Sequence, residues 1–319
     1  MRKNKFGPVI WAVTPFDENR LKTQASSGTM IDALFGDAAK VRPVCVWDTA
    51  AIETRSNAIF SRWEKPKIRG ELLSLHVLEA WGGPSAQARA LAEYAKKQRA
   101  SLIVANHHRR TGVKRWFQGS FCESLALSSE VPLLIVPPEW KVASGKKRIL
   151  FPTDLSAAST AAFDEVVAVA KARGMEIVLY HRAEYPVFIG EEFVYTVSRE
   201  MASIERNAQR EARRKLDEMV ARARIAGVKA RKKYDRRRGG RPADGILEES
   251  GIGYAMVAMA AHNGLLGRIV MGSTSRAVVR ESRIPIWVVR TRTAEKRKPS
   301  AMRSTPKEVK ETEPEAYLS

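Results

Sequence analysis

The chain has 319 residues, 44% of them hydrophobic, which suits roughly two domains of ordinary size that each build a core. Its two cysteines, Cys45 and Cys122, exclude a disulfide framework and predict reduced, buried thiols in a cytoplasmic protein. The net charge is +20, and no window approaches the roughly 18 apolar residues of a membrane span. The basic N-terminus is followed by an apolar run that resembles a signal peptide, but Pro8 and Pro15 interrupt it and favour a strand.

The first half of the chain alternates between strand and helix patterns. Apolar runs predict strands over 8–13, 43–47, 72–78, 101–105 and 133–136. A polar loop over 14–27 is expected to lead into a helix over 30–41, and the turn at Gly82 into a helix over 86–98. Between them, Ile52, Ile59, Phe60 and Trp63 fit a short amphipathic helix.

The second half repeats this order more clearly. Strands are predicted over 147–151, 176–181, 228–234, 254–260 and 286–289. Asp154 or Ser156 can cap the first helix of this half, and Gly174 can end it. A long basic helix over 197–223 carries one apolar stripe, and a shorter helix ends at Ser250.

The two halves also share a local pattern near their ends. The Ser of a Gly-Ser pair, Ser120 or Ser273, lies twelve residues before the Pro, Pro132 or Pro285, that precedes the last strand. Such a repeated order of strand, loop, helix and strand predicts two copies of one domain. We expect domains over 1–143 and 144–291, followed by a tail over 292–319 that is too poor in apolar residues to fold and is therefore disordered.

Strands this uniformly apolar, alternating with helices, predict parallel sheets covered on both sides. The expected fold class is α/β, with two tandem doubly wound, Rossmann-like domains. Such sheets bind ligands beyond the carboxyl ends of their strands, where the winding reverses. In the second domain this edge follows the first strand, at Pro152, Thr153 and Asp154, and the fourth strand, over 261–272.

The second copy resembles the universal stress protein family. The segments KRILFPTDLS and AAHNGLLGRIVMGSTS with IPIWVVR resemble the family's opening turn, nucleotide loop and closing strand, over nearly all of 146–290. The first copy resembles it over 82–138 and departs before that. The resemblance implies a tandem universal stress protein with the adenine nucleotide alpha hydrolase-like fold, in which two domains stand in for the usual dimer. It also implies a regulatory or protective, non-enzymatic role in stress.

The resemblance further implies a degenerate site for ATP or AMP in the second domain. ATP-binding members carry Gly-x-x-Gly, nine further residues and Gly-Ser or Gly-Thr; here Ala260 and Asn263 replace the first two glycines, and the loop is one residue shorter. Arg182 stands after the second strand, where binders have an apolar residue. The implied cofactor-binding residues are Pro152, Thr153, Asp154, Met259, Ala260, His262, Asn263, Gly267, Gly272, Ser273 and Thr274. The first domain keeps only Gly119 and Ser120 and is expected to be structural.

The alternative function is polyanion binding. Residues 206–241 hold 15 Lys or Arg against four acids, an excess of 15 − 4 = +11, which forms either a solvated face or a patch for nucleic acid, an anionic surface or an acidic partner. No nucleic-acid module accompanies them, so base-specific readout is not expected. The sequence also lacks an acid/base constellation, and His107 and His108 lack companions at metal-ligand spacing, so neither catalysis nor a metal site is predicted.

The final strand of each copy suggests how the domains associate. An apolar edge strand left uncovered invites aggregation, and in related dimers this strand mediates pairing. We therefore expect the strand from Leu133 to Val136 to pair with that from Ile286 to Val289, in antiparallel fashion, within one chain. Whether the chain dimerises further stays open.

Overall fold

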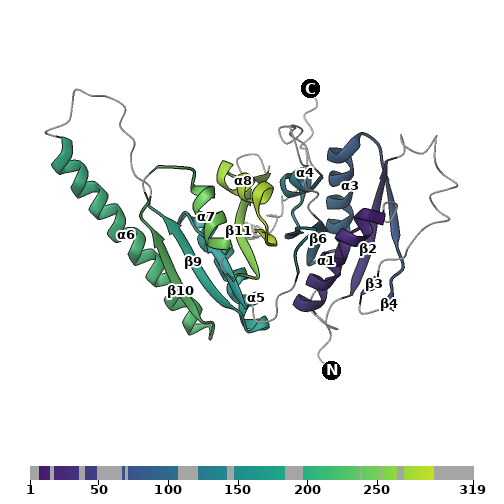
Figure 1. Cartoon of the computed structure of the whole chain (residues 1–319), viewed down its shortest axis with the longest axis horizontal. Coiled ribbons are helices and arrows are strands. Elements are labelled where there is room, and N and C mark those ends of the chain that lie inside the picture. Colours follow the sequence, from purple (N-terminus) through teal and green to yellow (C-terminus); the bar gives the residue numbers. More distant parts are fainter. Residues whose placement is uncertain are drawn as a thin grey trace, which may run out of the picture.

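The computed structural model describes residues 7–14, 18–35, 40–48, 67–68, 71–106, 121–141, 147–183, 197–237, 239–251, 253–263 and 269–290. Two α/β domains lie side by side, and their sheets meet in the middle of the molecule (Figure 1). The predicted fold class is confirmed. The tail expected over 292–319 and the helix expected around Ile52 to Trp63 lie outside the described residues.

The first domain is built on five parallel strands in the order β7-β6-β1-β2-β5. These are β1 (Val9–Ala12), β2 (Val41–Asp48), β5 (His76–Ala80), β6 (Leu102–Asn106) and β7 (Leu133–Val136). Its helices are α1 (Glu18–Phe35), α3 (Gly83–Lys97) and α4 (Phe121–Ser128). A separate antiparallel pair joins β3 (Lys67–Ile68) to β4 (Glu71–Leu72).

Two sequence predictions in this domain are wrong. Helix α1 begins at Glu18, whereas a loop was predicted as far as residue 27. Ser26 and Ser27 are weak helix formers, but both are buried, and hydrogen bonds to distant partners outweigh their local preference. The predicted strand over 72–78 is divided between β4 and β5, with residues 73–75 outside both strands.

The second domain repeats the parallel sheet in the order β10-β9-β8-β11-β13. These are β8 (Arg148–Pro152), β9 (Glu176–Arg182), β10 (Ala230–Asp235), β11 (Met256–Asn263) and β13 (Ile286–Arg290), and a short β12 (Ile269–Val270) lies antiparallel to β11. Its helices are α5 (Ala157–Arg173), α6 (Val197–Ile225), α7 (Pro242–Ser250) and α8 (Ser273–Glu281). Ser156 caps α5 by accepting a hydrogen bond from Ser159 N, and Gly174 ends it with a φ of 61°, as predicted.

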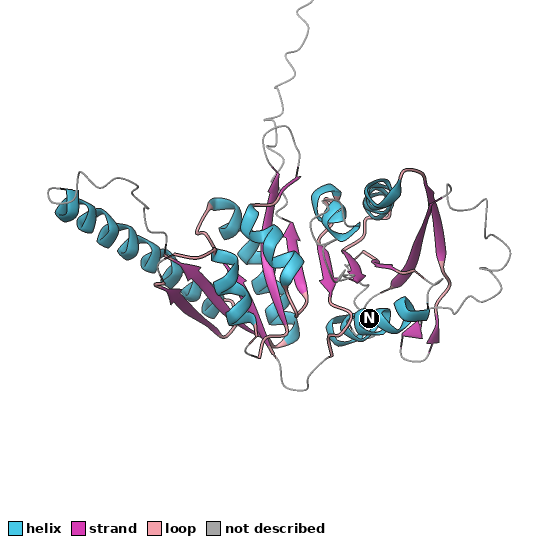
Figure 2. Ribbon diagram, turned by 45° about the horizontal axis from the view of Figure 1, so that its top comes forward, coloured by secondary structure: helices cyan, strands magenta, loops and turns pink. Residues whose placement is uncertain are grey.

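Helix α6 is longer than the sheet beside it (Figure 2). Leu216, Met219 and Ala223 in its carboxyl-terminal half are buried, and the helix packs there on β10. Ile204 lies on the same predicted apolar stripe, but 60% of its surface is exposed. The stripe therefore contributes to the core only over its second half.

The two domains are joined by strands β7 and β13, which pair in antiparallel fashion as predicted. The register places Ile286 opposite Ile135 and Trp287 opposite Leu134. One continuous sheet consequently runs from β10 to β5 through both domains. Beside this junction, Arg280 of α8 makes an ion pair with Glu123 of α4.

A buried arginine lies next to the junction. Arg290, at the end of β13, is 8% exposed and donates through Nη2 to the carbonyl oxygen of Ala126 in α4. Its Nε and Nη1 have no hydrogen-bond partner in the part of the chain that the structure describes. Burial lowers the pKa of Arg290 to about 10, because the charged form loses its hydration.

Cys45 and Cys122 are free and buried, as predicted. Burial raises the pKa of both thiols to about 12. Among the described residues, no helix is long and apolar enough to cross a membrane.

The junction predicts a matched pair of Leu→Ala effects on stability. Leu134 in β7 is 1% exposed, so Leu134→Ala should lower the free energy of unfolding by about 2–5 kcal/mol through lost burial and a residual cavity. Leu127 in α4 is 39% exposed, and Leu127→Ala should change it by no more than about 0.5 kcal/mol. Denaturant titration of both variants measures the difference, and equal losses would contradict the importance of the junction.

Candidate functional site

A cavity of about 860 Å³ lies at the carboxyl edge of the second domain's sheet. Residues at the ends of β8, β9, β10 and β11 and at the start of α8 form its walls. This is the edge at which open parallel sheets bind ligands. The lining residues are Pro152, Thr153, Asp154, Ser156, Ala158, Ser159, Tyr180, His181, Arg182, Ala183, Arg237, Gly239, Gly240, Pro242, Ile246, Met259, Ala260, Gly272, Ser273, Thr274 and Ser275.

The turn from β8 to α5 forms one wall and is held by its own side chains. Thr153 Oγ1 lies 2.7 Å from Ser159 Oγ and accepts a hydrogen bond from Leu155 N at 3.0 Å. Asp154 Oδ1 accepts from Ser156 N at 3.0 Å, which leaves the rest of this exposed carboxylate facing solvent. Leu155 adopts a φ of 62°, a conformation that a non-glycine residue takes only where its surroundings impose it.

His181 forms the floor of the cavity beside this turn. The side chain is buried, and its Nδ1 lies 2.8 Å from the carbonyl oxygen of Thr153. Because a carbonyl oxygen only accepts, Nδ1 carries a proton and donates it to this carbonyl. His181 therefore fixes the β8 turn against β9.

The opposite wall is the amino-terminal end of α8. Gly272 precedes this nine-residue helix in an extended conformation, and no side chain caps the helix. A Cβ atom at Gly272 would meet nothing within 4 Å, so the space before the helix is open. Free N–H groups and the positive end of the helix dipole make such a terminus suitable for an anion, above all a phosphate.

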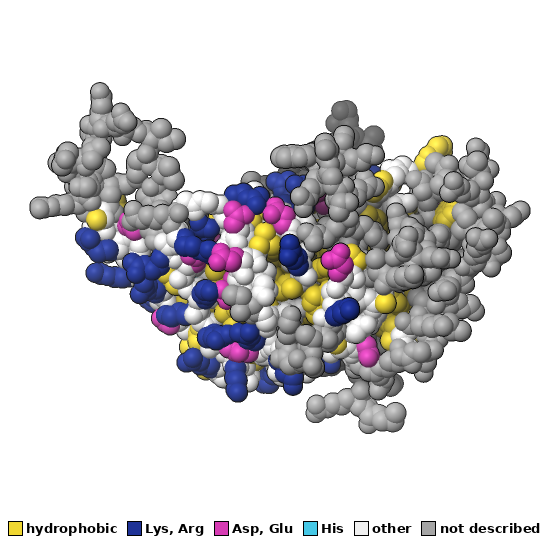
Figure 3. Space-filling view, in the orientation of Figure 1, with side chains coloured by type: hydrophobic (Ala, Val, Ile, Leu, Met, Phe, Trp, Pro, Cys, Tyr) yellow, Lys and Arg dark blue, Asp and Glu magenta, His cyan; other side chains and the backbone are white. Residues whose placement is uncertain are grey.

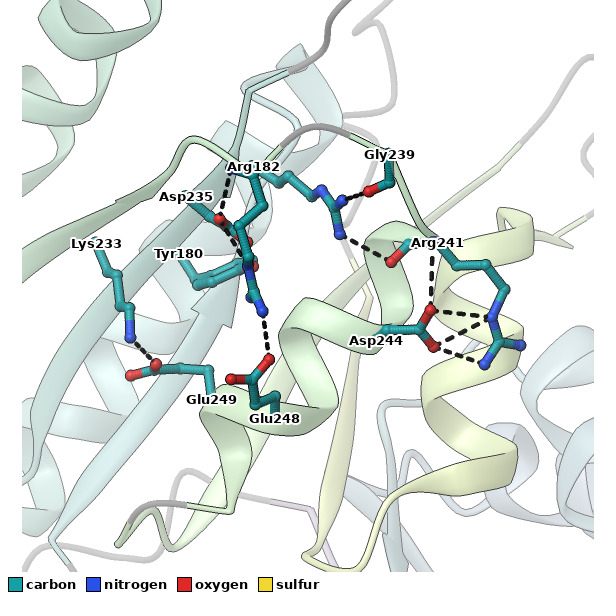
Figure 4. A network of polar contacts seen from close by, with 10 residues as sticks. Tyr180, Arg182, Lys233, Asp235, Gly239, Arg241, Asp244, Glu248 and Glu249 are labelled. Carbon is teal, nitrogen blue, oxygen red and sulfur yellow. Dashed lines mark hydrogen bonds and ion pairs between the residues drawn. The ribbon is translucent and has the colours of Figure 1, made fainter.

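A network of charges supports the corner where β10 leads into α7 (Figure 4). Asp235, 7% exposed, accepts hydrogen bonds from the Tyr180 hydroxyl and from Nε and Nη2 of Arg237. Arg237 also makes an ion pair with Glu248 of α7. Burial opposes ionisation of Asp235, but the bonds from Arg237 and Tyr180 outweigh it and hold its pKa well below the usual range.

Arg182 lies beside this network, at the end of β9. It donates through Nη1 to the carbonyl oxygen of Arg241 at 2.9 Å and through Nη2 to that of Gly239. Gly239 and Gly240 both have left-handed φ values, 72° and 71°, that favour glycine. Arg182 thereby ties the glycine turn to the sheet, and Arg241 continues the link through Asp244 and Glu281.

Eight of the eleven predicted binding residues line the cavity, namely Pro152, Thr153, Asp154, Met259, Ala260, Gly272, Ser273 and Thr274. His262 and Asn263 fall on the last two positions of β11, where their backbone pairs with β12, and their side chains lie outside the described part of the structure. Gly267 lies outside the described residues. No sequence pattern points to Tyr180, His181 or Arg237, because their roles depend on partners 28 to 55 positions away or on a corner that only the fold assembles.

The corresponding edge of the first domain is filled by side chains. Trp11 Nε1 donates to Ser27 Oγ at 2.8 Å, and Ser27 Oγ lies 2.6 Å from Asn106 Oδ1. Asn106 Nδ2 donates to Ser26 Oγ at 3.1 Å, and all four residues are at most 8% exposed. We call Trp11, Ser26, Ser27 and Asn106 the serine cluster. It joins β1 and α1 to the end of β6, and residues 107–120, which follow β6, lie outside the described part.

Most cations of the basic segment 206–241 have carboxylate partners. Acidic and basic side chains intermingle over α6 and β10 (Figure 3). Ion pairs join Arg214 to Glu211 and Glu218, Arg222 to Asp164, Arg231 to Glu176, Lys232 to Asp217 and Lys233 to Glu249. Within the described residues, Arg206 and Arg210 have no ion pair, and Arg238 lies outside them.

The network at the cavity corner predicts an unusual effect of Gly245→Ala. In an ordinary helix this change stabilises by about 1 kcal/mol, but here the new Cβ would lie 2.3 Å from the Tyr180 hydroxyl oxygen and 3.0 Å from Asp235 Oδ2. We expect Gly245→Ala to destabilise the protein by about 1–3 kcal/mol through overpacking. In a Tyr180→Phe background the penalty should shrink, because the clashing oxygen is gone. Strictly additive losses in thermal or urea unfolding would show that the two residues do not compete for space.

Comparison with known proteins places this geometry in a family. The sequence model of the universal stress protein family matches the chain twice, over residues 31–137 and 146–290. Together these segments cover more than half of the chain, one in each domain. No curated protein matches the sequence.

Two solved structures share the tandem architecture. A universal stress protein from Archaeoglobus fulgidus DSM 4304 is 17% identical, with a TM-score of 0.55 over 89% of this chain and 96% of that one. A functionally unknown protein from Pseudomonas aeruginosa PAO1 is 12% identical, with a TM-score of 0.54 over 90% and 93%. At these identities the likeness concerns the fold alone. The two family matches, one in each half of the joined sheet, show that the chain belongs to the universal stress protein family and carries its domain in tandem.

Proposed function

We propose that this universal stress protein binds a nucleoside phosphate, such as ATP or AMP, in its second domain and acts as a regulatory or protective protein in stress. The observation that carries the proposal is the cavity between the β8 turn and the uncapped start of α8. Its volume of about 860 Å³ falls within the range of ordinary small-molecule sites. The two buried, free cysteines support a role in the reducing cytoplasm.

The proposed arrangement follows from the charges of the walls. The phosphates lie at Gly272, Ser273 and Thr274, where the free N–H groups of α8 point into the cavity edge. Asp154, exposed on the opposite turn, offers an acceptor for a ribose hydroxyl. Gly272 permits close approach because it has no side chain.

The proposed role is binding rather than catalysis. A hydrolase would need a group placed to activate water. The candidate groups in the cavity, His181 and Asp154, already make hydrogen bonds to the β8 turn. His181 holds the Thr153 carbonyl, and Asp154 accepts from the backbone of its own turn. Among the described residues no cluster of three or more potential metal ligands occurs.

The proposal predicts that Gly272→Glu abolishes nucleotide binding while leaving the fold intact. A carboxylate there fills the open space and repels phosphate, yet its charge suits the positive end of α8. Calorimetric or thermal-shift titration with ATP and AMP up to millimolar concentration measures the loss, with Ala221→Glu on the exposed face of α6 as the charge-matched control. No response of the native chain, or an equal response in Gly272→Glu, would contradict the proposal.

Polyanion binding through residues 206–241 is the alternative proposal. Its support comes from the cations that make no ion pair with a described residue, which include Arg206, Arg210 and Lys229, since several others are held by carboxylates. Chromatography on heparin tests it, because contacts to a polyanion weaken steeply with salt. The alternative predicts that Arg206→Glu and Arg210→Glu elute at clearly lower salt than the native chain, and unchanged elution would end it.

A further inference from the structure

Arg182 is the feature of the cavity that the proposed function leaves unused. Of the two arginines in the lining, Arg237 has carboxylate partners in Asp235 and Glu248, whereas Arg182 donates to backbone carbonyls alone among the described residues. The single acid in the described lining, Asp154, lies in the turn between β8 and α5. Arg182 therefore brings to the cavity wall a guanidinium that makes no ion pair with a described residue.

The position of Arg182 in the sheet determines which part of a nucleotide would reach it. Arg182 is the last residue of β9. Strand β8 lies between β9 and β11 in the sheet, and the chain continues from β11 through β12 to α8. Two strand spacings, or about 10 Å, therefore separate the strand of Arg182 from the strand nearest the phosphate wall. This span is comparable with the length of a nucleoside monophosphate. With its phosphate at α8, the ligand places its base at the Arg182 corner.

The chemistry of a guanidinium distinguishes between purines. It carries five N–H donors and no acceptor, and two of these donors are engaged by Gly239 and Arg241. Guanine presents two neighbouring acceptors, O6 and N7, which arginine pairs in bidentate fashion. Adenine presents N7 beside an amino group, which is itself a donor and leaves one guanidinium donor unpaired.

The same two carbonyl contacts hold Arg182 at this corner. The carbonyl oxygens of Gly239 and Arg241 engage its Nη2 and Nη1, as Figure 4 shows. The glycine turn is in turn anchored through Arg241, Asp244 and Glu281. A side chain that is fixed before binding loses less entropy when a ligand arrives.

We propose that Arg182 makes the second-domain cavity selective for a 6-oxopurine nucleotide, of the guanine or hypoxanthine class, over an adenine nucleotide. The inference rests on the proposed function, because it requires the phosphate to lie at α8. It narrows the ligand class that the family resemblance implies. It makes Arg182 a specificity-determining residue.

Calorimetric titration of the full chain with GMP, IMP and AMP tests this selectivity. These ligands share the ribose and phosphate, and IMP differs from AMP only at the base edge. GMP and IMP should bind about ten-fold more tightly than AMP, as expected for one bidentate contact. Arg182→Met, which keeps the length of the chain but removes every donor, should bring the three dissociation constants within about two-fold of one another.

Two controls separate base recognition from general attraction or misfolding. Arg182→Lys keeps the charge but not the paired donors, so it should lose most of the preference while all three ligands still bind. Arg206→Met, on the exposed part of α6, should retain the preference of the native chain. Thermal unfolding of each variant establishes that it is folded. If Arg182→Met does not fold, the comparison of Arg182→Lys with the native chain tests the selectivity instead.

The outcomes separate this inference from the function on which it rests. Equal affinity for AMP and GMP in the native chain, or a preference that survives in Arg182→Met, overturns the selectivity and leaves phosphate binding at α8 intact. Equal weakening of all three ligands in Arg182→Met also overturns it, since Arg182 would then act only as a general attractor of anions. If none of the ligands binds at millimolar concentration, both proposals fail together.

Discussion

The antiparallel pairing of β7 with β13 is the interaction on which the rest of the molecule depends. Each strand is wholly buried, and each would be an exposed apolar edge without the other. Their union makes one continuous sheet whose edge strands are β10, which carries Arg231, Lys232 and Lys233, and β5. The ion pair of Arg280 with Glu123 and the bond from Arg290 to Ala126 lie beside the same junction. The first domain therefore stabilises the second through this shared junction.

The two domains use the same fold differently. In the first, the serine cluster fills the carboxyl edge with hydrogen-bonded side chains, and buried polar groups that are mutually satisfied make such a region rigid. In the second, the same edge holds the cavity, and polar side chains form part of its walls. Duplication removes the need for both halves to bind, because one copy suffices to cover the partner's edge strand. In the proposed function, nucleotide binding belongs to the second domain, whereas the pairing of β7 with β13 involves both.

Much of this could be predicted from sequence, because it depends on local pattern. The bounds of β7, the cap at Ser156 and the end of α5 at Gly174 all follow from apolar runs and capping chemistry. The amino-terminal part of helix α1 could not be predicted, because Ser26 and Ser27 are stabilised by partners about 80 and 111 positions away. The same holds for the candidate site: Gly272 and Asp154 sit in recognisable motifs, whereas Tyr180 meets Asp235 only once β9 and β10 are paired. Residues whose role depends on strand order are invisible in a single sequence.

We propose that the two copies of the domain differ in function, with the nucleotide cavity in the second copy. The number of nucleotides bound per chain tests it most directly, measured by equilibrium dialysis of the full chain against a labelled nucleoside monophosphate at saturation. One nucleotide per chain is the predicted result. Two per chain would show that the first domain also binds, and none would show that the second domain's cavity is not a nucleotide site.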